Sequence, residues 1–164
     1  MHGPMVWATV YRILDDHADA LDCYQEVFFE AYRRIDCQAV DNWPALLKWL
    51  GTRRAIDALR RRKREKNLPV GNLEDLESTS VHVHPSDLMQ LRELMDRLKL
   101  ELANLPSRQG EAFWLRSIEQ LTYAEIAGQM ETDTTEVGVL IHRARQSLQI
   151  ALSEFTASPV TEPS

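Results

Sequence analysis

Apolar residues recur at intervals of three and four along most of the chain, which is the spacing of one face of an α-helix. In the first third of the sequence this pattern predicts helices over residues 5–14, 18–35 and 43–66. Polar residues at 15–17 separate the first two helices. Asn42 precedes the third helix as a candidate N-cap, because its side-chain oxygen can accept a hydrogen bond from a backbone N–H of the first turn.

The second half of the chain repeats the pattern in shorter segments. It predicts helices over residues 86–104, 108–117 and 122–130, and a last helix that opens at Thr134 or Thr135. A turn of three or four residues separates the last two segments, which is the layout of a helix-turn-helix. The buried stripe of the last helix is predicted to consist of Val137, Ile141, Ala144 and Leu148.

Two local signals support the helix-turn-helix. Thr122 is followed three residues later by Glu125, which is a capping box at a helix start. Ala127 and Gly128 are small enough to let the two helices cross closely. The side of the last helix that would face the DNA major groove or its phosphates holds Thr135, Glu136, Gly138, Val139, His142, Arg143 and Gln146.

The helical pattern is lost between the two sets of segments, where Pro, Gly, Ser and acidic residues gather. We therefore predict an all-α protein of two small helical domains, residues 1–66 and 88–155, joined by a flexible linker over 67–87. The C-terminal domain contains the helix-turn-helix. Residues 156–164 are rich in Ser, Thr and Pro, and we expect them to form a disordered tail.

One charged stretch stands out in a protein whose net charge is −6. Residues 53–66 hold eight basic and two acidic side chains and no Gly or Pro. Ala55, Ile56 and Leu59 would form a narrow apolar stripe, and arginines would cover the rest of the helix. A wide cationic face of this kind is a good phosphate binder. The alternative is a solvated helix end, where the helix dipole favours cations.

Composition excludes several classes of protein. No apolar run approaches the roughly 20 residues that span a bilayer, and the N-terminus lacks the pattern of a signal peptide. We therefore expect a cytoplasmic protein with no membrane segment. Cys23 and Cys37 have no C-x-x-C spacing, so we expect reduced thiols that serve in packing.

The sequence offers no catalytic or metal site. His82 and His84 alternate with valines, and no further ligands lie nearby, so we expect neither a metal nor a cofactor. No Gly-rich phosphate loop and no Ser–His or Cys–His arrangement is visible. We therefore expect that the protein is not an enzyme.

Several segments together resemble one family. Residues 19–28 read DALDCYQEVF and are similar to the D-A-x-D-x-x-Q-E-x-F segment of bacterial RNA polymerase sigma factors of the compact extracytoplasmic-function group. Residues 54–61 read RAIDALRR and resemble the R-A-I-D-x-x-R-R segment of that family. The segments that resemble its C-terminal domain are LPSR at 105–108, LTYAEIA at 121–127 and HRAR at 142–145. The resemblance covers nearly all of residues 5–152.

This resemblance implies a transcription initiation factor whose partners are core RNA polymerase and promoter DNA. Family members are commonly held by an anti-sigma factor, which makes such a protein a further partner. The positions that the resemblance implies for core polymerase binding are Asp22, Gln25 and Glu26, on the acidic side of helix 18–35. The positions that it implies for the −10 promoter element are Trp43, Arg53, Arg54, Asp57, Arg60 and Arg61.

The C-terminal domain would bind the −35 element. The positions that the resemblance implies there are Arg108, Thr122, Tyr123, Thr135, Glu136, Val139, His142 and Arg143. The recognition helix departs from the family, because Val137 is followed by Gly138, Val139 and Leu140 where basic residues are often found. Contacts to base edges from these three positions are therefore limited to backbone and apolar contacts.

Two other interpretations remain open at this point. A helix-turn-helix regulator of two domains would keep the basic helix but would have no need of the acidic positions Asp22, Gln25 and Glu26. A helical protein-interaction module would leave the basic stretch as solvated surface. Retention of core polymerase by the tagged protein separates the sigma-factor interpretation from both.

Overall fold

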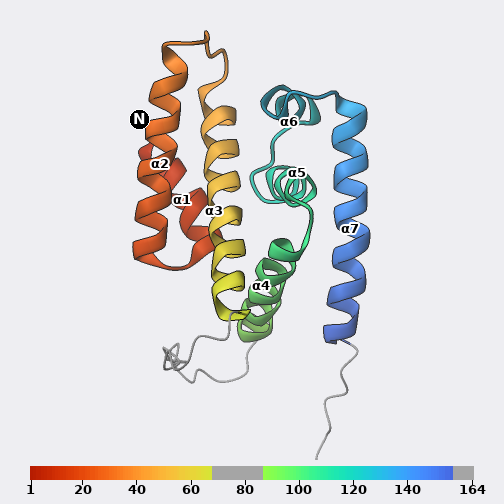
Figure 1. Ribbon diagram of the computed structural model, residues 1–164. Coiled ribbons are helices and arrows are strands. Elements are labelled where there is room, and N and C mark those ends of the chain that lie inside the picture. The colour runs from red at the N-terminus through yellow and green to blue at the C-terminus, as the bar shows by residue number, and fades with distance from the viewer. Residues whose placement is uncertain (68–86, 157–164) are drawn as a thin grey trace, which may run out of the picture.

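The structure, a computed structural model, describes residues 1–67 and 87–156, and the regular secondary structure in these two ranges is helical (Figure 1). The helices are α1 (Gly3–Leu14), α2 (His17–Ile35), α3 (Trp43–Asn67), α4 (Asp87–Asn104), α5 (Ser107–Ser117), α6 (Tyr123–Met130) and α7 (Thr134–Thr156). The all-α prediction is confirmed. Most of the predicted linker, including His82, His84 and Ser86, and most of the predicted tail lie outside the described residues. Asn67, Asp87 and Thr156, at the edges of these predicted segments, are helix ends.

Side-chain caps set the helix starts in the N-terminal domain. The carboxylate of Asp16 accepts a hydrogen bond from the backbone N–H of Asp19 at 2.9 Å and opens α2. Asn42 accepts from the backbone N–H of Ala45 at 3.1 Å, as predicted for the start of α3. Asp15 ends α1 in the left-handed conformation with φ of 47°. Short polar residues tolerate that conformation better than others, so the break between α1 and α2 is encoded locally.

At Gly51, α3 packs closely against α1. A Cβ atom at this position would lie 3.3 Å from Cγ2 of Thr9 and 3.5 Å from Cγ1 of Val10. Thr9, Val10 and Gly51 are all buried. A glycine inside a helix costs about 1 kcal/mol relative to alanine. At this position the missing side chain lets α3 pack tightly against α1.

The C-terminal domain has the predicted helix-turn-helix. Thr122 and Glu125 form the capping box of α6, and Glu131, with φ of 55°, starts the turn into α7. The predicted stripe of α7 is confirmed, since all four of its members are buried: Val137, Ile141, Ala144 and Leu148. The role predicted for Gly128 is wrong, because this residue is exposed and a Cβ there would meet nothing within 4 Å. The small residue buried in α6 is Ala127.

The helix α3 forms the side of the N-terminal domain that faces the C-terminal domain (Figure 1). It packs against α1 and α2 on one side and against α4, α5 and α6 on the other. Its residues Leu46, Trp49 and Leu50 share one apolar core with Leu115 and Ile126 of the C-terminal domain. In the basic stretch, Ala55 and Ile56 of the predicted stripe are buried and Leu59 is half-buried. The helix α3 thus has neighbours on both sides.

Candidate functional site

The three residues predicted for polymerase binding lie together on α2. Asp22 and Gln25 are exposed and Glu26 is half-buried. They line a hollow of about 360 Å³ between α2 and α3, and Arg61 and Arg62 form part of its α3 side. One wall is therefore acidic and the other basic, and both remain open to solvent.

Exposed apolar side chains that sequence reasoning missed lie along α2, and one of them, Phe29, lines this hollow. Phe29 is 69% exposed and Tyr32 is 68% exposed, although aromatic side chains of this size are usually covered. Leu21 and Ile35 recur at the spacing of the apolar positions of this helix but are also exposed. The physical reason is that α2 buries only a narrow stripe, Ala20, Cys23, Val27 and Ala31. Leu21, Gln25, Phe29 and Tyr32 recur at intervals of four, four and three, so they share one side of the helix beside the buried stripe, and this spacing is the sequence signal that would have found the surface.

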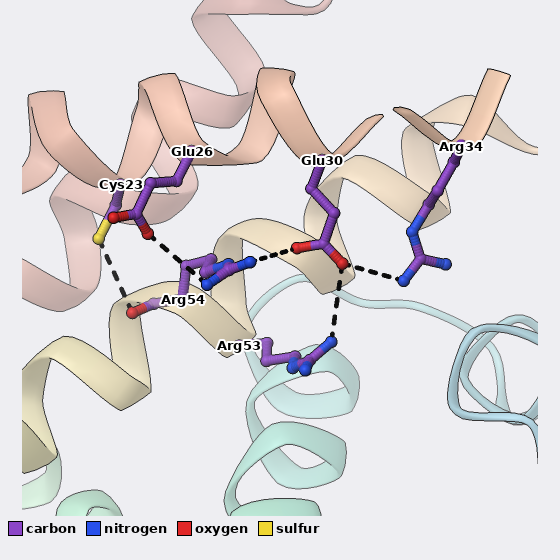
Figure 2. Close-up of polar contacts among 6 residues, drawn as sticks. All are labelled: Cys23, Glu26, Glu30, Arg34, Arg53 and Arg54. Atoms are coloured by element: carbon purple, nitrogen blue, oxygen red, sulfur yellow. Dashed lines mark hydrogen bonds and ion pairs between the residues drawn. The ribbon is translucent and has the colours of Figure 1, made fainter. Parts of the chain in front are cut away.

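Glu30 connects α2 to α3 through several arginines (Figure 2). Arg54 donates to its Oε2 atom at 2.7 Å, Arg34 donates to Oε1 at 3.0 Å, and the guanidinium of Arg53 lies 3.8 Å from Oε1. Burial by itself would raise the pKa of Glu30, but the hydrogen bonds and charges of Arg54 and Arg34 outweigh it and hold the pKa below its ordinary value. The carboxylate therefore stays ionised and fixes the direction of these guanidinium groups.

The prediction that the arginines of α3 form an open cationic face is wrong for four of them, because these four bind other groups of the protein. Arg53 and Arg54 pair with Glu30, and Arg54 also lies 3.8 Å from Glu26. The remaining two are Arg62, which binds Asp19 and the carbonyl of Leu14, and Arg60, which donates to Ser107 and to the carbonyl of Leu105. Arg61 and Arg64 are exposed and keep the predicted orientation. The reason is that α3 has neighbours on two sides.

An indole that the prediction did not include lies among these groups. Trp49 is 9% exposed, and the guanidinium groups of Arg34 and Arg53 lie 5.3 and 5.4 Å from its ring centre. This is the geometry of a cation–π contact for each guanidinium. The predicted −10 residues Trp43 and Asp57 are half-buried. Trp43 packs against the core, so its ring is held in place at the start of α3.

The two cysteines differ in environment. Cys23 is buried and its pKa is raised to about 11, first by burial and then by the charge of Glu26. It is a thiol in the packed stripe of α2, as expected. Cys37 is exposed, so its predicted role in packing is wrong. It follows the C-terminal end of α2, where no helix covers it.

The exposed side of α7 presents the predicted set for the −35 element. Thr135, Glu136, His142 and Arg143 are exposed, and Val139 is 37% exposed. Of the two neighbours that interrupt this surface, Leu140 is buried and Gly138 packs near the ring of Tyr123. Packing within the domain therefore explains Gly138 and Leu140. Of the three residues after Val137, Val139 is the one whose apolar side chain is exposed to a partner.

The remaining −35 positions border the same surface. Thr122 is exposed, and its hydroxyl accepts the backbone N–H of Glu125 at 3.1 Å. Tyr123 is half-buried beneath the guanidinium of Arg116, which lies 5.1 Å from the ring centre. Arg108 is exposed at the start of α5 and donates to the carbonyl of Met130 at 3.5 Å. The predicted −35 surface thus includes residues from the start of α5, the start of α6 and the exposed side of α7.

Two features are absent from the described residues. In the ranges 1–67 and 87–156, no three His, Cys, Asp or Glu side chains are grouped closely enough to hold a metal ion. The same ranges contain no helix long and apolar enough to cross a membrane.

Comparisons with known proteins match both halves of the chain. The family model of sigma-70 region 2 matches residues 1–65, and that of sigma-70 region 4 matches residues 89–148. The ECF RNA polymerase sigma factor SigW of Bacillus subtilis is 27% identical over 157 residues, which cover 92% of this chain and 84% of SigW. The ECF RNA polymerase sigma factor SigE of Mycolicibacterium smegmatis is 28% identical over 159 residues, which cover 95% of this chain but 60% of SigE.

A solved structure shows the same fold. The sigma factor RpoE from Bartonella quintana, solved in complex with the anti-sigma factor NepR, superposes with a TM-score of 0.56 and 22% identity, covering 92% of this chain and 91% of RpoE. Region 2 therefore corresponds to α1–α3 and region 4 to α4–α7, in the order that the sequence motifs indicated. The chain belongs to the sigma-70 family of RNA polymerase sigma factors, in the extracytoplasmic-function group.

Proposed function

We propose that the protein binds core RNA polymerase and directs it to promoters by recognising the −10 and −35 elements. The observation that carries this proposal is the presence of sigma-70 regions 2 and 4 in order along one chain. Residues 1–66 would form the domain for polymerase and the −10 element, and residues 88–155 the domain for the −35 element. The protein would act in the cytoplasm, where it serves as a transcription factor and not as an enzyme.

The surface of α2 supports the polymerase part of the proposal. Asp22, Gln25 and Glu26 lie beside exposed Phe29 and Tyr32, which gives an acidic patch with an aromatic border. Exposed aromatic side chains next to charged residues are typical of protein interfaces. A regulator that only binds DNA has no use for this combination, so the surface favours a sigma factor over the alternative helix-turn-helix regulator.

The surfaces of α3 and α7 support the DNA part. Arg61 and Arg64 of α3 are exposed, and Glu30 holds Arg53 and Arg54 in fixed directions. On α7, Arg143 and His142 lie on the exposed side of a helix-turn-helix. Cations on α3 can neutralise phosphates, and α7 has the position of a helix that enters the major groove. An anti-sigma factor is a further proposed partner, as RpoE was solved with NepR.

Retention of core polymerase tests this function. The tagged protein should retain purified core RNA polymerase, and the variant Asp22→Lys/Glu26→Lys should not, because charge reversal turns an attractive surface into a repulsive one. Glu93→Lys/Asp96→Lys on α4 is the matched control, since the change in net charge is the same. If the wild-type protein retains no polymerase, the proposed function is wrong. Equal retention by the wild type and both variants would mean that polymerase binds outside the acidic positions of α2.

A further inference from the structure

The outward side of α7 has an apolar residue at its centre. Exposed positions that recur at intervals of four, three and four share the side opposite the buried stripe, and they are Thr135, Val139, His142 and Gln146. Val139 lies within this row and is 37% exposed. Figure 1 shows α7 at the edge of the molecule, with α5 and α6 on its inner side. The row therefore faces away from the rest of the protein.

Neither sequence neighbour of Val139 competes with it for a partner. Gly138 has no side chain and packs beside Tyr123, since a Cβ atom there would lie 3.7 Å from Cε2 of that ring. Leu140 is buried. The packing of α7 is supplied by its buried residues, so the core does not require an apolar side chain at position 139. What this valine offers to a partner is two methyl groups.

A valine in a helix presents its methyl groups in a fixed direction. β-Branched side chains have one strongly preferred χ1 rotamer there, so Val139 loses little conformational freedom when a partner covers it. Thr135 and His142 lie one turn before it and one turn after it, at the distance of side-chain neighbours on a helix. Val139 therefore forms a small, rigid apolar contact between two polar side chains.

The place of Val139 in the helix-turn-helix brings it to base edges. In this motif the second helix enters the major groove, and residues near its N-terminal end contact the bases. The helix α7 begins at Thr134, so Val139 lies in its second turn. Arg143 lies one turn further on the same exposed side, where a cation can reach a phosphate. Val139 is thus the apolar side chain near the start of α7 that would meet a base.

Thymine is the base that complements such a side chain. In the major groove it presents a methyl group, whereas guanine, adenine and cytosine present hydrogen-bond donors and acceptors. A valine placed over those polar groups would remove water from them without replacing the lost hydrogen bonds, which is unfavourable. Over thymine the valine would bury the methyl group of the base against its own methyl groups, which is favourable.

We propose that Val139 recognises the 5-methyl group of a thymine in the −35 element, and that this apolar contact makes thymine the preferred base at one fixed position of the element. This inference rests on the proposed function, because it assigns base specificity to the helix that is proposed to bind the −35 element. The contact differs from a phosphate contact, since it depends on the base sequence and releases no counterions.

Removal of single methyl groups from the DNA tests the proposal. The holoenzyme is bound to a duplex promoter, identified by run-off transcription, in which each thymine of the −35 element is replaced in turn by deoxyuridine on either strand. Deoxyuridine lacks the 5-methyl group and keeps the hydrogen-bonding groups of thymine. For the wild type we expect a loss of affinity of about four-fold at one position, which corresponds to one buried methyl group. Equal affinity for the parent duplex and for every deoxyuridine duplex would overturn the proposal, and this outcome needs no variant.

Two variants assign the methyl contact to its side chain. Val139→Ala should bind thymine and deoxyuridine almost equally at that position, because it lacks the two methyl groups that make the contact. Ile150→Ala is the matched control, since it shortens another exposed apolar side chain of α7 that lies outside the predicted −35 set. It should keep the wild-type preference for thymine. A preference that persists in Val139→Ala, or that disappears in Ile150→Ala as well, would overturn the proposal.

Salt dependence separates the loss of this contact from a displaced helix. Val139→Ala should leave the salt slope of promoter binding unchanged, because no phosphate contact is lost. A flattened slope would show that α7 has moved on the DNA, and the assignment to the methyl group would then be wrong. Failure of the proposed function is distinguishable, because it gives no promoter complex. Failure of this inference leaves a promoter complex that does not respond to the methyl group.

Discussion

Arg54 donates a hydrogen bond of 2.7 Å to Glu30 and so joins the basic part of α3 to the middle of α2 (Figure 2). The Glu30 side chain is only 15% exposed, and it also binds Arg34. The pKa of Arg54 is raised, first of all by its hydrogen bond to Glu30. One carboxylate therefore organises the arginines that the proposed −10 surface requires.

Loss of the Glu30 charge should destabilise the N-terminal domain. Glu30→Gln keeps the shape of the side chain but leaves neighbouring guanidinium groups without their counter-charge, so we expect a loss of about 1–3 kcal/mol in the free energy of unfolding. Glu26→Gln is the control, because Glu26 is 45% exposed and lies 3.8 Å from Arg54. It should cost less than about 0.5 kcal/mol. Urea denaturation measures both, and equal losses would contradict the role given to Glu30.

The same carboxylate predicts a direction for acid sensitivity. The pKa of Glu30 is lower in the folded protein than its ordinary value. Its contribution is therefore fully present above the ordinary value and is lost as the pH falls through the folded value. The difference in unfolding free energy between wild type and Glu30→Gln should shrink as the solution is acidified below about pH 4.5. A difference that grows on acidification would contradict this assignment.

Glu111 should show the opposite dependence. Burial raises its pKa, with Asp57 adding to the rise and Arg53, Trp49 and Arg108 opposing it. The folded protein then binds a proton more tightly than the unfolded chain, so stability falls as the pH rises from about 4.5 through the raised value. The unfolding free energy of Glu111→Gln should lack this fall and should therefore increase relative to that of the wild type across this pH range. Parallel stability curves of the two proteins would contradict the raised pKa of Glu111.

The two proposed DNA surfaces should differ in their salt dependence. Arg60→Ala/Arg61→Ala should weaken binding of the holoenzyme to all promoters and flatten the salt slope by about one unit for each phosphate that is no longer neutralised. Arg143→Ala should cost less and act only on templates with an intact −35 element. Binding to fork-junction and duplex promoter DNA at several salt concentrations measures both effects. A larger loss from Arg143→Ala would contradict the assignment of most phosphate contacts to the basic stretch.

Local signals explain why much of the fold could be predicted from the sequence. Asn42 and Thr122 cap the helices that they were expected to cap, because a cap depends on a few neighbouring residues. The buried stripe of α7 follows from its spacing in the same way. The packing role predicted for Cys37 was wrong because burial beyond the end of a helix depends on where the neighbouring helices lie.

The contact between the domains could not be predicted by these means. Arg60 and Ser107 are 47 residues apart, and Arg12 and Glu119 are 107 residues apart. No periodic pattern links positions at such separations. The basic run 53–66 looked like an open surface because its pattern shows neither the carboxylates of α2 nor the polar groups near the start of α5 that bind its arginines. Its charges were identified correctly, whereas their partners within the protein are set by the packing of helices that are distant in sequence.

Run-off transcription tests the central claim most directly. The purified protein is added to core RNA polymerase and a pool of bacterial promoter fragments, and the transcripts are mapped. The account predicts discrete transcripts that start downstream of a shared −10 and −35 sequence, that require this protein, and that disappear with Asp22→Lys/Glu26→Lys. Transcription that is the same with and without the protein, although the protein is folded and polymerase is active, would contradict the account.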